Sequence, residues 1–257
     1  MGRWIAFKPR GHFNYTSKTI KRHWGRLHAA DCIAFPDDAD VLEAWVLFHN
    51  GHFEEAYRLG LALDTAGFTV ANKAICVYAA LLEHRETQRL RLLQEASERA
   101  ANHIQRAPHD PNAHYLMAYA LGRYSQGISV AQALAQGLGS RIKNALETTI
   151  ALEPRHADGH FALGAFHADI IDKVGTLIAS MTYGAKGETS LQLFQRGFAL
   201  HPHSPFGLAE YATALLVLEG DSQQKQAEKL YRQAASLKPL DAHHFLDIAL
   251  AQTSVRG

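Results

Sequence analysis

The sequence predicts an all-α protein, a solenoid of about five helical hairpins with a capping helix. Two observations support this fold class. Amphipathic helices that run into a proline recur along the chain, and a small residue recurs at one offset after each of these prolines. Self-similarity of this kind is the signature of stacked repeats, in which each unit buries its apolar face against its neighbours.

Composition and charge indicate an ordinary soluble globular chain. Hydrophobic residues make up 47% and charged residues 20% of the sequence, and the formal net charge is +1. This balance gives no global attraction to nucleic acid or to a membrane surface. The two cysteines, Cys32 and Cys76, lie far apart without a CxxC spacing, so we expect neither a disulfide nor a cysteine zinc site.

No apolar run is long enough to span a membrane, so we expect no membrane span. The short apolar run from Trp4 to Phe7 ends at Lys8, well before the length of a signal peptide. A cytoplasmic protein is the expected result.

Four segments share the helix-end pattern, an amphipathic stretch that reaches a proline. Proline has no N–H donor and clashes with the preceding turn, so each helix stops there. The pattern occurs at Ile150–Pro154, Phe198–Pro202 and Ala235–Pro239, with a fainter copy at Ile104–Pro108. After each proline the next helix is predicted to begin within a few residues, and the expected starts are Pro111, Ala157, Pro205 and Ala242.

Inside each following helix, a small residue stands at the same distance from the proline. These residues are Ala118, Gly164, Ala212 and Ala249. A bulky residue precedes each one, namely Met117, Leu163, Tyr211 and Ile248. A large side chain facing a small one is the geometry of closely packed antiparallel helices.

The last copy identifies the type of repeat. Ala227, Tyr231, Ala234 and Pro239 resemble the second helix of a tetratricopeptide (TPR) repeat at every signature position, and Gly51–Ala56 resembles the turn of another copy. The resemblance implies a right-handed superhelical solenoid.

The resemblance to TPR proteins extends from about residue 39 to residue 250. It implies five copies and a closing helix over about 242–252. We therefore divide the chain into a basic N-terminal segment with a capping helix, residues 1–36, and a TPR-like solenoid, residues 37–257.

Two insertions lengthen the middle copies beyond the roughly 34 residues of an ideal repeat. They lie between the first and second helices of these copies, near 125–139 and 172–187. The first insertion carries no charge and the second very little. Paired insertions of this kind resemble those of an irregular TPR group, which includes bacterial TRAP-transporter T components and the regulator-of-microtubule-dynamics proteins.

The search for catalytic motifs finds no P-loop, no nucleophile elbow and no HExxH, so we expect no catalytic residues and no cofactor. The sixteen histidines are the one argument for an enzyme or a metal site. His156 and His160 are four apart on one helix, a spacing that can chelate a metal. However, His160 and His114 occupy the place of a packed aromatic in the TPR pattern, and His156 falls in the turn. We therefore predict hydrogen-bonded, partly buried rings and no bound metal.

Four more histidines fall at turns or helix starts, where we expect surface side chains. They are His201, His203, His243 and His244.

In TPR proteins the first helix of each hairpin lines the concave groove, so the resemblance implies a set of groove-facing residues. Aromatic residues and arginine dominate interface energetics, which favours them as partner-binding residues. The candidate partner-binding residues are Trp45, Asn112, Tyr115, Tyr119, Arg123, Asp158, Phe161, Asp169 and Phe206, with His49, Ala165, Ala209 and Thr213 as neighbours. Some of the aromatic residues could equally be core. Asn112 and Arg123 alone do not complete the Lys, Asn and Arg cluster with which TPR proteins grip a C-terminal carboxylate, which argues against a chaperone-tail receptor.

The first thirty residues are basic, with no acidic residue before Asp31. Thr16 or Ser17 can cap a helix that places Ile20 and Trp24 on one face. We expect this helix to cover the open end of the solenoid, because an unpaired terminal repeat needs a cap. Its basic face is either solvated or in contact with an acidic partner.

The predicted function is a non-enzymatic scaffold or adaptor that binds a partner peptide or helix in its concave groove. The alternative is a carrier that encloses an apolar small molecule between the groove and the Gly-rich insertions. The sequence leaves open the identity of the partner and the oligomeric state.

Overall fold

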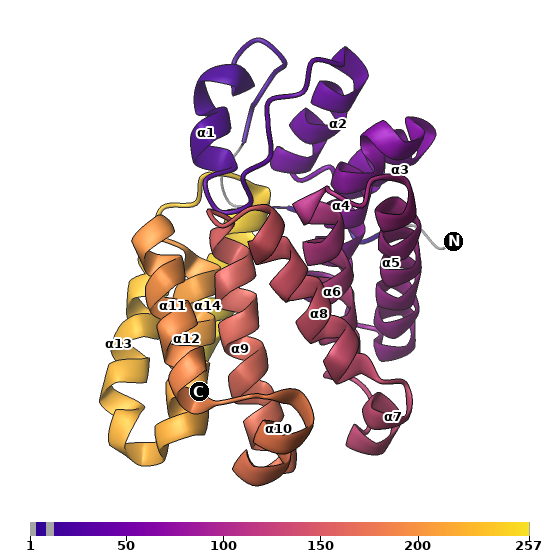
Figure 1. Cartoon of the computed structure of the whole chain (residues 1–257). Helices are drawn as coiled ribbons and strands as arrows, with labels where there is room; N and C mark the ends of the chain where they lie inside the picture. The colour runs from indigo at the N-terminus through magenta and orange to yellow at the C-terminus, as the bar shows by residue number, and fades with distance from the viewer. Residues whose placement is uncertain (1–3, 9–12, 257) are drawn as a thin grey trace.

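The computed structural model describes residues 4–8 and 13–256, and within these residues all regular structure is helical, with no strand (Figure 1). Five helical hairpins follow one another, and a last helix, α14 (Ala242–Arg256), packs on the fifth. The hairpins are α2 (Ala39–His49) with α3 (Phe53–Ala62), α4 (Phe68–Leu81) with α5 (Glu86–Arg106), α6 (Pro111–Ser125) with α8 (Leu138–Leu152), α9 (Ala157–Val174) with α11 (Gly187–Leu200), and α12 (Pro205–Glu219) with α13 (Gln224–Ala235). The predicted all-α superhelical solenoid is confirmed.

The predicted helix starts are confirmed, and local capping explains them. Asp110 accepts a hydrogen bond from the Asn112 amide at 2.8 Å, directly before α6. Ser204 does the same for Gly207 at 3.0 Å, before α12. Each cap is followed by a proline in the first helical turn, where a missing N–H donor is harmless.

The small residues admit large side chains from the next helix. A Cβ atom added at Gly164 of α9 would lie 3.0 Å from the Phe194 ring of α11. Ala118 and Ala212 are buried at the equivalent positions of α6 and α12. The recurring small residue is therefore the contact point between helices of a hairpin, as the offset pattern indicated.

Each insertion forms a short helix, and both helices lie at the same end of the molecule (Figure 1). Ser129 and Gln132 form a reciprocal capping box at the start of α7 (Val130–Ala135). Two glycines with positive φ, Gly175 and Gly184, bound α10 (Thr176–Tyr183), at 79° and 63°. Nowhere in 4–8 and 13–256 does a helix combine the length and apolar character required to cross a bilayer.

The N-terminal segment packs differently from the predicted cap. The expected helix is only a 3-10 turn, η1 (Ile20–His23), followed by one α-turn, α1 (Trp24–Leu27). Ile20 and Trp24 are buried in a core shared with the first three hairpins, as their common face predicted. The following loop then crosses the inner side of the solenoid, so the segment does more than cover an open end. The division at residue 36 stays a prediction.

This crossing loop touches three successive hairpins. The Asp31 carboxylate binds Lys73 of α4, and the Asp31 carbonyl accepts from the Asn112 side chain of α6 at 3.0 Å. The Ala30 carbonyl accepts from the Asp158 amide of α9 at 3.1 Å. The first helices of these hairpins are thus held to one another through the chain's own loop.

The C-terminal helix also returns to the start of the solenoid. Helix α14 contacts both α2 and α4. The Tyr15 hydroxyl donates to the Leu240 carbonyl at 2.6 Å, and the Phe245 ring packs edge-on against Phe7 at 5.7 Å between centroids. The N-terminal segment and the start of α14 therefore lie against the first two hairpins and fill that part of the superhelix.

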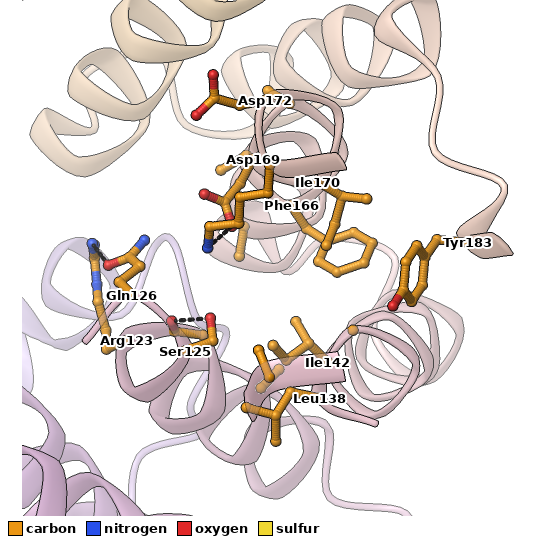
Figure 2. Close-up of a pocket in the computed structure, with 18 of the residues that line it drawn as sticks. Arg123, Ser125, Gln126, Leu138, Ile142, Phe166, Asp169, Ile170, Asp172 and Tyr183 are labelled. Carbon is orange, nitrogen blue, oxygen red and sulfur yellow. Dashed lines mark hydrogen bonds and ion pairs between the residues drawn. The ribbon is translucent and has the colours of Figure 1, made fainter. Parts of the chain in front are cut away.

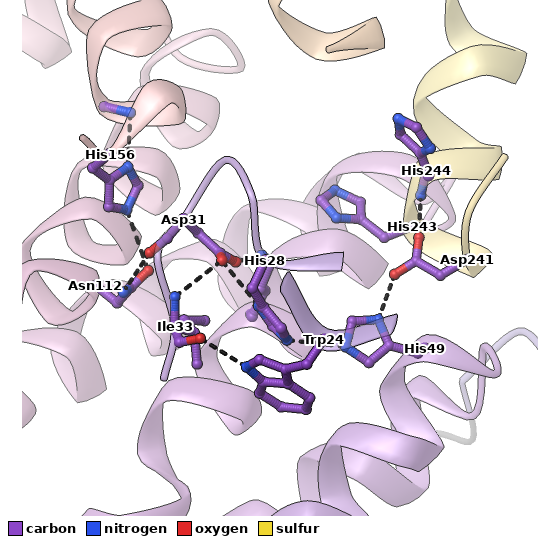
Figure 3. Close-up of polar contacts among 12 residues, drawn as sticks. Trp24, His28, Asp31, Ile33, His49, Asn112, His156, Asp241, His243 and His244 are labelled. Atoms are coloured by element: carbon purple, nitrogen blue, oxygen red, sulfur yellow. Dashed lines mark hydrogen bonds and ion pairs between the residues drawn. The ribbon is translucent and has the colours of Figure 1, made fainter. Parts of the chain in front are cut away.

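A series of buried polar side chains, here called the buried polar chain, joins the N-terminal segment to the start of α14 (Figure 3). Asp31 pairs with Lys73 and accepts from His28 Nδ1 at 2.9 Å. His28 Nε2 lies 3.2 Å from His49 Nε2, and His49 Nδ1 lies 2.5 Å from Asp241. Because ionised carboxylates only accept, each imidazole donates from Nδ1, and the contact between the two Nε2 atoms requires a further proton on one ring.

Electrostatics accounts for the burial of the two carboxylates in this chain. Burial lowers the pKa of His28 to about 4, so its ring is neutral at pH 7. Burial opposes the charge on Asp31, but Lys73 and His28 outweigh it and hold the pKa of that carboxyl well below its usual range. His49 likewise holds the pKa of Asp241 down, against the effect of burial. Each buried carboxylate therefore has a hydrogen-bonded partner that favours its charge, which makes its burial tolerable.

Removing Lys73 tests the ion pair. We expect Lys73→Met to lower the free energy of unfolding by about 3–5 kcal/mol, because it leaves the Asp31 charge buried without its cation. The double variant Asp31→Asn/Lys73→Met should recover much of this loss, since no charge is stranded. Arg232→Ala, which breaks an exposed pair with Glu228, should change it by less than about 1 kcal/mol. Urea unfolding measures all three. A double variant as unstable as Lys73→Met would show that the pairing is not the cause.

Asp158 predicts a dependence on pH. Burial raises the pKa of its carboxyl to about 7, with Asp31 adding to the effect and Lys73 opposing it. The folded state therefore keeps a proton that the unfolded chain releases near pH 4. This contribution to stability is complete below that pH and is lost as the pH rises towards 7. Asp158→Asn should be more stable than the wild type by about 1 kcal/mol or more at pH 8, with the difference vanishing near pH 4. Equal differences at both pH values would contradict the assignment.

Candidate binding pocket between the third and fourth hairpins

Two of the predicted groove residues lie in the core, so their placement on an open groove is wrong. The Phe161 ring is fully buried against Phe198, 4.9 Å away between centroids. Gly197 and Gly207 leave the space it fills, since a Cβ atom at either would lie within 2.6 Å of the ring. Trp45 is buried beneath the N-terminal segment, where it packs against His28 at 4.9 Å.

Three other predicted residues face the inner side but meet the chain itself. Asn112 is buried and bridges the Asp31 carbonyl and His156 Nε2, at 3.0 and 3.3 Å. Tyr115 and Asp158 line a cavity of about 70 Å³ beside the buried polar chain. The resemblance thus predicted the direction of these side chains, while the N-terminal loop already occupies the surface they face.

The remaining four predicted residues come together at an open pocket of about 220 Å³ (Figure 2). It lies between the third and fourth hairpins, at the end where the insertions project, with α12 along one side. The four are Tyr119, Arg123, Asp169 and Phe206. Helices α6 and α9 supply the first three, about two to three turns after the helix starts that the prolines fix.

The walls of the pocket are apolar. Leu138 and Ile142 of α8 lie opposite Phe166 and Ile170 of α9, with Tyr183 at one end (Figure 2). The Tyr183 ring occupies the space left by Gly139, where a Cβ atom would lie 2.6 Å from the ring. The insertion helices therefore build the far wall, since Val130 and Leu134 of α7 complete the lining.

Charged side chains lie at the rim of the pocket on two sides. Arg123 donates to Glu210 of α12 at 2.8 Å, and its guanidinium lies over the Tyr119 ring at 5.3 Å. Lys173 donates to Asp169 at 2.8 Å on the opposite wall. Burial raises the pKa of the Tyr119 hydroxyl to about 12, so this group is neutral and can donate or accept a hydrogen bond. The pocket therefore offers an apolar floor and a polar rim.

Several residues of the site were not predicted. The α8 wall, Leu138 and Ile142, belongs to a second helix, which the TPR pattern assigns to the outer layer. Lys73, which lies in the buried polar chain outside the pocket, was also not predicted; an isolated lysine in an otherwise apolar helix was the available signal. Together Lys73 and Asn112 hold an acidic residue, but that residue is the chain's own Asp31.

The side chains of His114, His156 and His160 are hydrogen-bonded within the fold, as predicted from the sequence. His160 Nε2 lies 3.0 Å from the Pro154 carbonyl, and His114 Nε2 makes the equivalent contact with Pro108 at 2.9 Å. His156 caps α9, with its Nδ1 accepting from Gly159. The described part of the chain contains no group of three or more His, Cys, Asp or Glu side chains placed to hold a metal. The absence of a bound metal stays a prediction.

The surface placement of three other histidines was wrong. His201, His243 and His244 line the small inner cavity. His244 accepts a hydrogen bond from the Leu240 amide at 3.1 Å, and burial lowers the pKa of His243 to about 3. Helix α14 places His243 and His244 there by packing back against the first hairpins, and His201 directly follows α11.

Comparison with known proteins identifies the family. A search of curated proteins gives no significant match. Among solved structures, a thermophilic TPR protein from Thermus thermophilus matches with a TM-score of 0.56 and 14% identity, over 83% of this chain and 97% of that one. This likeness concerns the fold. The family model described as Regulator of microtubule dynamics protein 1-3 matches residues 42–251, which include the five hairpins except the first residues of α2, and most of α14. The chain therefore belongs to the regulator of microtubule dynamics protein 1-3 family of TPR-like repeat proteins.

Proposed function

We propose that this chain is a non-enzymatic, cytoplasmic scaffold that binds a peptide or helix of a partner protein by seating an apolar side chain in the pocket between the third and fourth hairpins. The observation that carries the proposal is the pocket itself, an apolar volume of about 220 Å³ with a charged rim. TPR-like helical repeats generally mediate protein interactions, which supports a binding role.

The size of the pocket favours a partner side chain. Pockets for drug-sized ligands span about 300–1,000 Å³. A dry cavity of about 150 Å³ accommodates a benzene ring. A volume of about 220 Å³ therefore suits one aromatic or two aliphatic side chains presented by a partner segment.

The rim supplies the polar contacts that such a segment needs. Arg123 and Glu210 stand on one side, with Asp169 and Lys173 on the other. Both signs of charge are present, so the rim can pair with polar side chains on either side of an apolar anchor. Anchors of this kind in a desolvated pocket carry most of the binding energy of an interface.

The rest of the inner side also favours a partner protein bound at this pocket. The N-terminal loop and α14 occupy the concave face of the first hairpins, and the loop also covers the starts of α6 and α9, which leaves the pocket end of the third to fifth hairpins for a partner. The name of the family concerns the regulation of microtubule dynamics, and a module that holds a partner protein is suited to such a role.

A pocket-filling variant tests the proposal. Ala165 lines the pocket from α9, so Ala165→Phe should occupy the volume without disturbing the core. We expect affinity capture of the partner from source cells to fall about tenfold or more. Ala199→Phe, the same change at an exposed position of α11, is the control and should capture as the wild type does. Equal capture by Ala165→Phe would place the partner site elsewhere.

The second candidate function is binding of an apolar small molecule in the same pocket. The apolar walls and the insertion helices that complete them favour it. We expect native mass spectrometry of protein purified from its source to show the bare chain, in line with a protein partner. A bound molecule of constant mass that disappears in Ala165→Phe would instead favour the carrier.

A further inference from the structure

Exposed apolar side chains gather on the two insertion helices. Val130 and Leu134 of α7 are exposed, and on α10 the exposed fractions are 72% for Leu177, 55% for Ile178 and 80% for Met181. These are five of the eight large apolar side chains exposed in the described residues. Exposed apolar patches of this kind mark sites of interaction with proteins or membranes.

Both helices lie at the same end of the solenoid, and together with these five side chains they are here called the apolar tip. Helix α10 packs on α8 through Tyr183, whose ring lies over Gly139, and α7 packs on the same helix. Figure 1 shows both short helices at the same end of the solenoid, away from α1 and α2. The tip is therefore a projection beside the pocket, held by packing.

The apolar tip contains no charge. Residues 127–140 and 174–185 include no Asp, Glu, Lys or Arg. The residues that follow these stretches, Arg141 and Lys186, are cationic and exposed, and neither forms an ion pair within the described residues. A charge near lipid tails is unfavourable, whereas long cationic side chains at the border reach the headgroups.

The size of the tip argues against a stable protein interface. Such interfaces bury about 800 Å² on each partner and use about 20–30 residues a side. The tip has five exposed apolar side chains on helices of six and eight residues. A bilayer surface demands less, because a few large apolar side chains that enter the boundary of headgroups and tails give reversible attachment.

We propose that the apolar tip inserts shallowly into a lipid bilayer surface and attaches the solenoid to it reversibly. Attachment comes from apolar burial, so it requires no anionic lipid. It directs the end of the molecule that carries the pocket towards the membrane. The inference goes beyond the partner-binding function and does not depend on what the pocket holds.

Vesicle flotation tests the proposal. We expect the full chain to float with phosphatidylcholine vesicles, and Leu177→Ser/Met181→Ser to lose about tenfold or more of this binding, because each large apolar side chain contributes on that order. Both side chains are exposed, so the thermal midpoint should stay close to the wild type. Ile5→Ser/Leu250→Ser is the matched control, with two exposed apolar residues outside the tip, and should float normally.

The alternatives give different results. A wild-type chain that does not float but self-associates in light scattering, through Leu177 and Met181, would make the tip a contact between copies and overturn the proposal. Binding only to vesicles that contain phosphatidylserine, lost at high salt, would assign attachment to the basic N-terminal segment and overturn it too. Ala165→Phe fills the pocket and should float as the wild type does, so failure of the pocket function and failure of this inference are distinguishable.

Discussion

The contact between Asp31 and Lys73 decides how the inner side of this solenoid is used. Two unit charges leave water at that point, which is favourable only when each has a close opposite charge and further hydrogen bonds. The Asp31 carboxylate pairs with Lys73 of α4 and accepts a hydrogen bond from His28 of its own segment. From His28 the contacts continue through His49 to Asp241. Satisfying one buried carboxylate thus joins the N-terminal segment, the first two hairpins and the last helix.

This arrangement divides the molecule into a filled half and an open half. Over the first hairpins, the crossing loop and α14 occupy the surface that other TPR-like proteins leave free. Between the third and fourth hairpins, the insertions lengthen the repeats and their helices fold back to wall a pocket. The same insertions leave apolar side chains in solvent at their outer face. The pocket and the exposed apolar side chains therefore both come from the two insertions, which a regular repeat lacks.

The sequence predicted which face of the helices carries the candidate site, but only some of the predicted residues line it. Tyr119, Arg123, Asp169 and Phe206 reach the open pocket because the prolines fix where α6, α9 and α12 begin, and helical periodicity then fixes which face they occupy. Phe161 shares that periodicity, yet its ring enters the slot left by Gly197 and Gly207 on neighbouring helices. Whether an aromatic residue at a helix face is core or surface depends on which helix lies across from it.

Local sequence signals predict the helices of the repeats, their ends and their order, because proline, capping side chains and the spacing of small residues act within one or two turns of the chain. What occupies the inner side depends on contacts between distant segments. No local pattern marks the pairs Asp31–Lys73 and His49–Asp241, because their members are far apart in sequence. They meet when the N-terminal segment and the start of α14 pack against the first two hairpins. Desolvation then makes these contacts obligatory, since a buried charge without a partner is unfavourable wherever the chain places it.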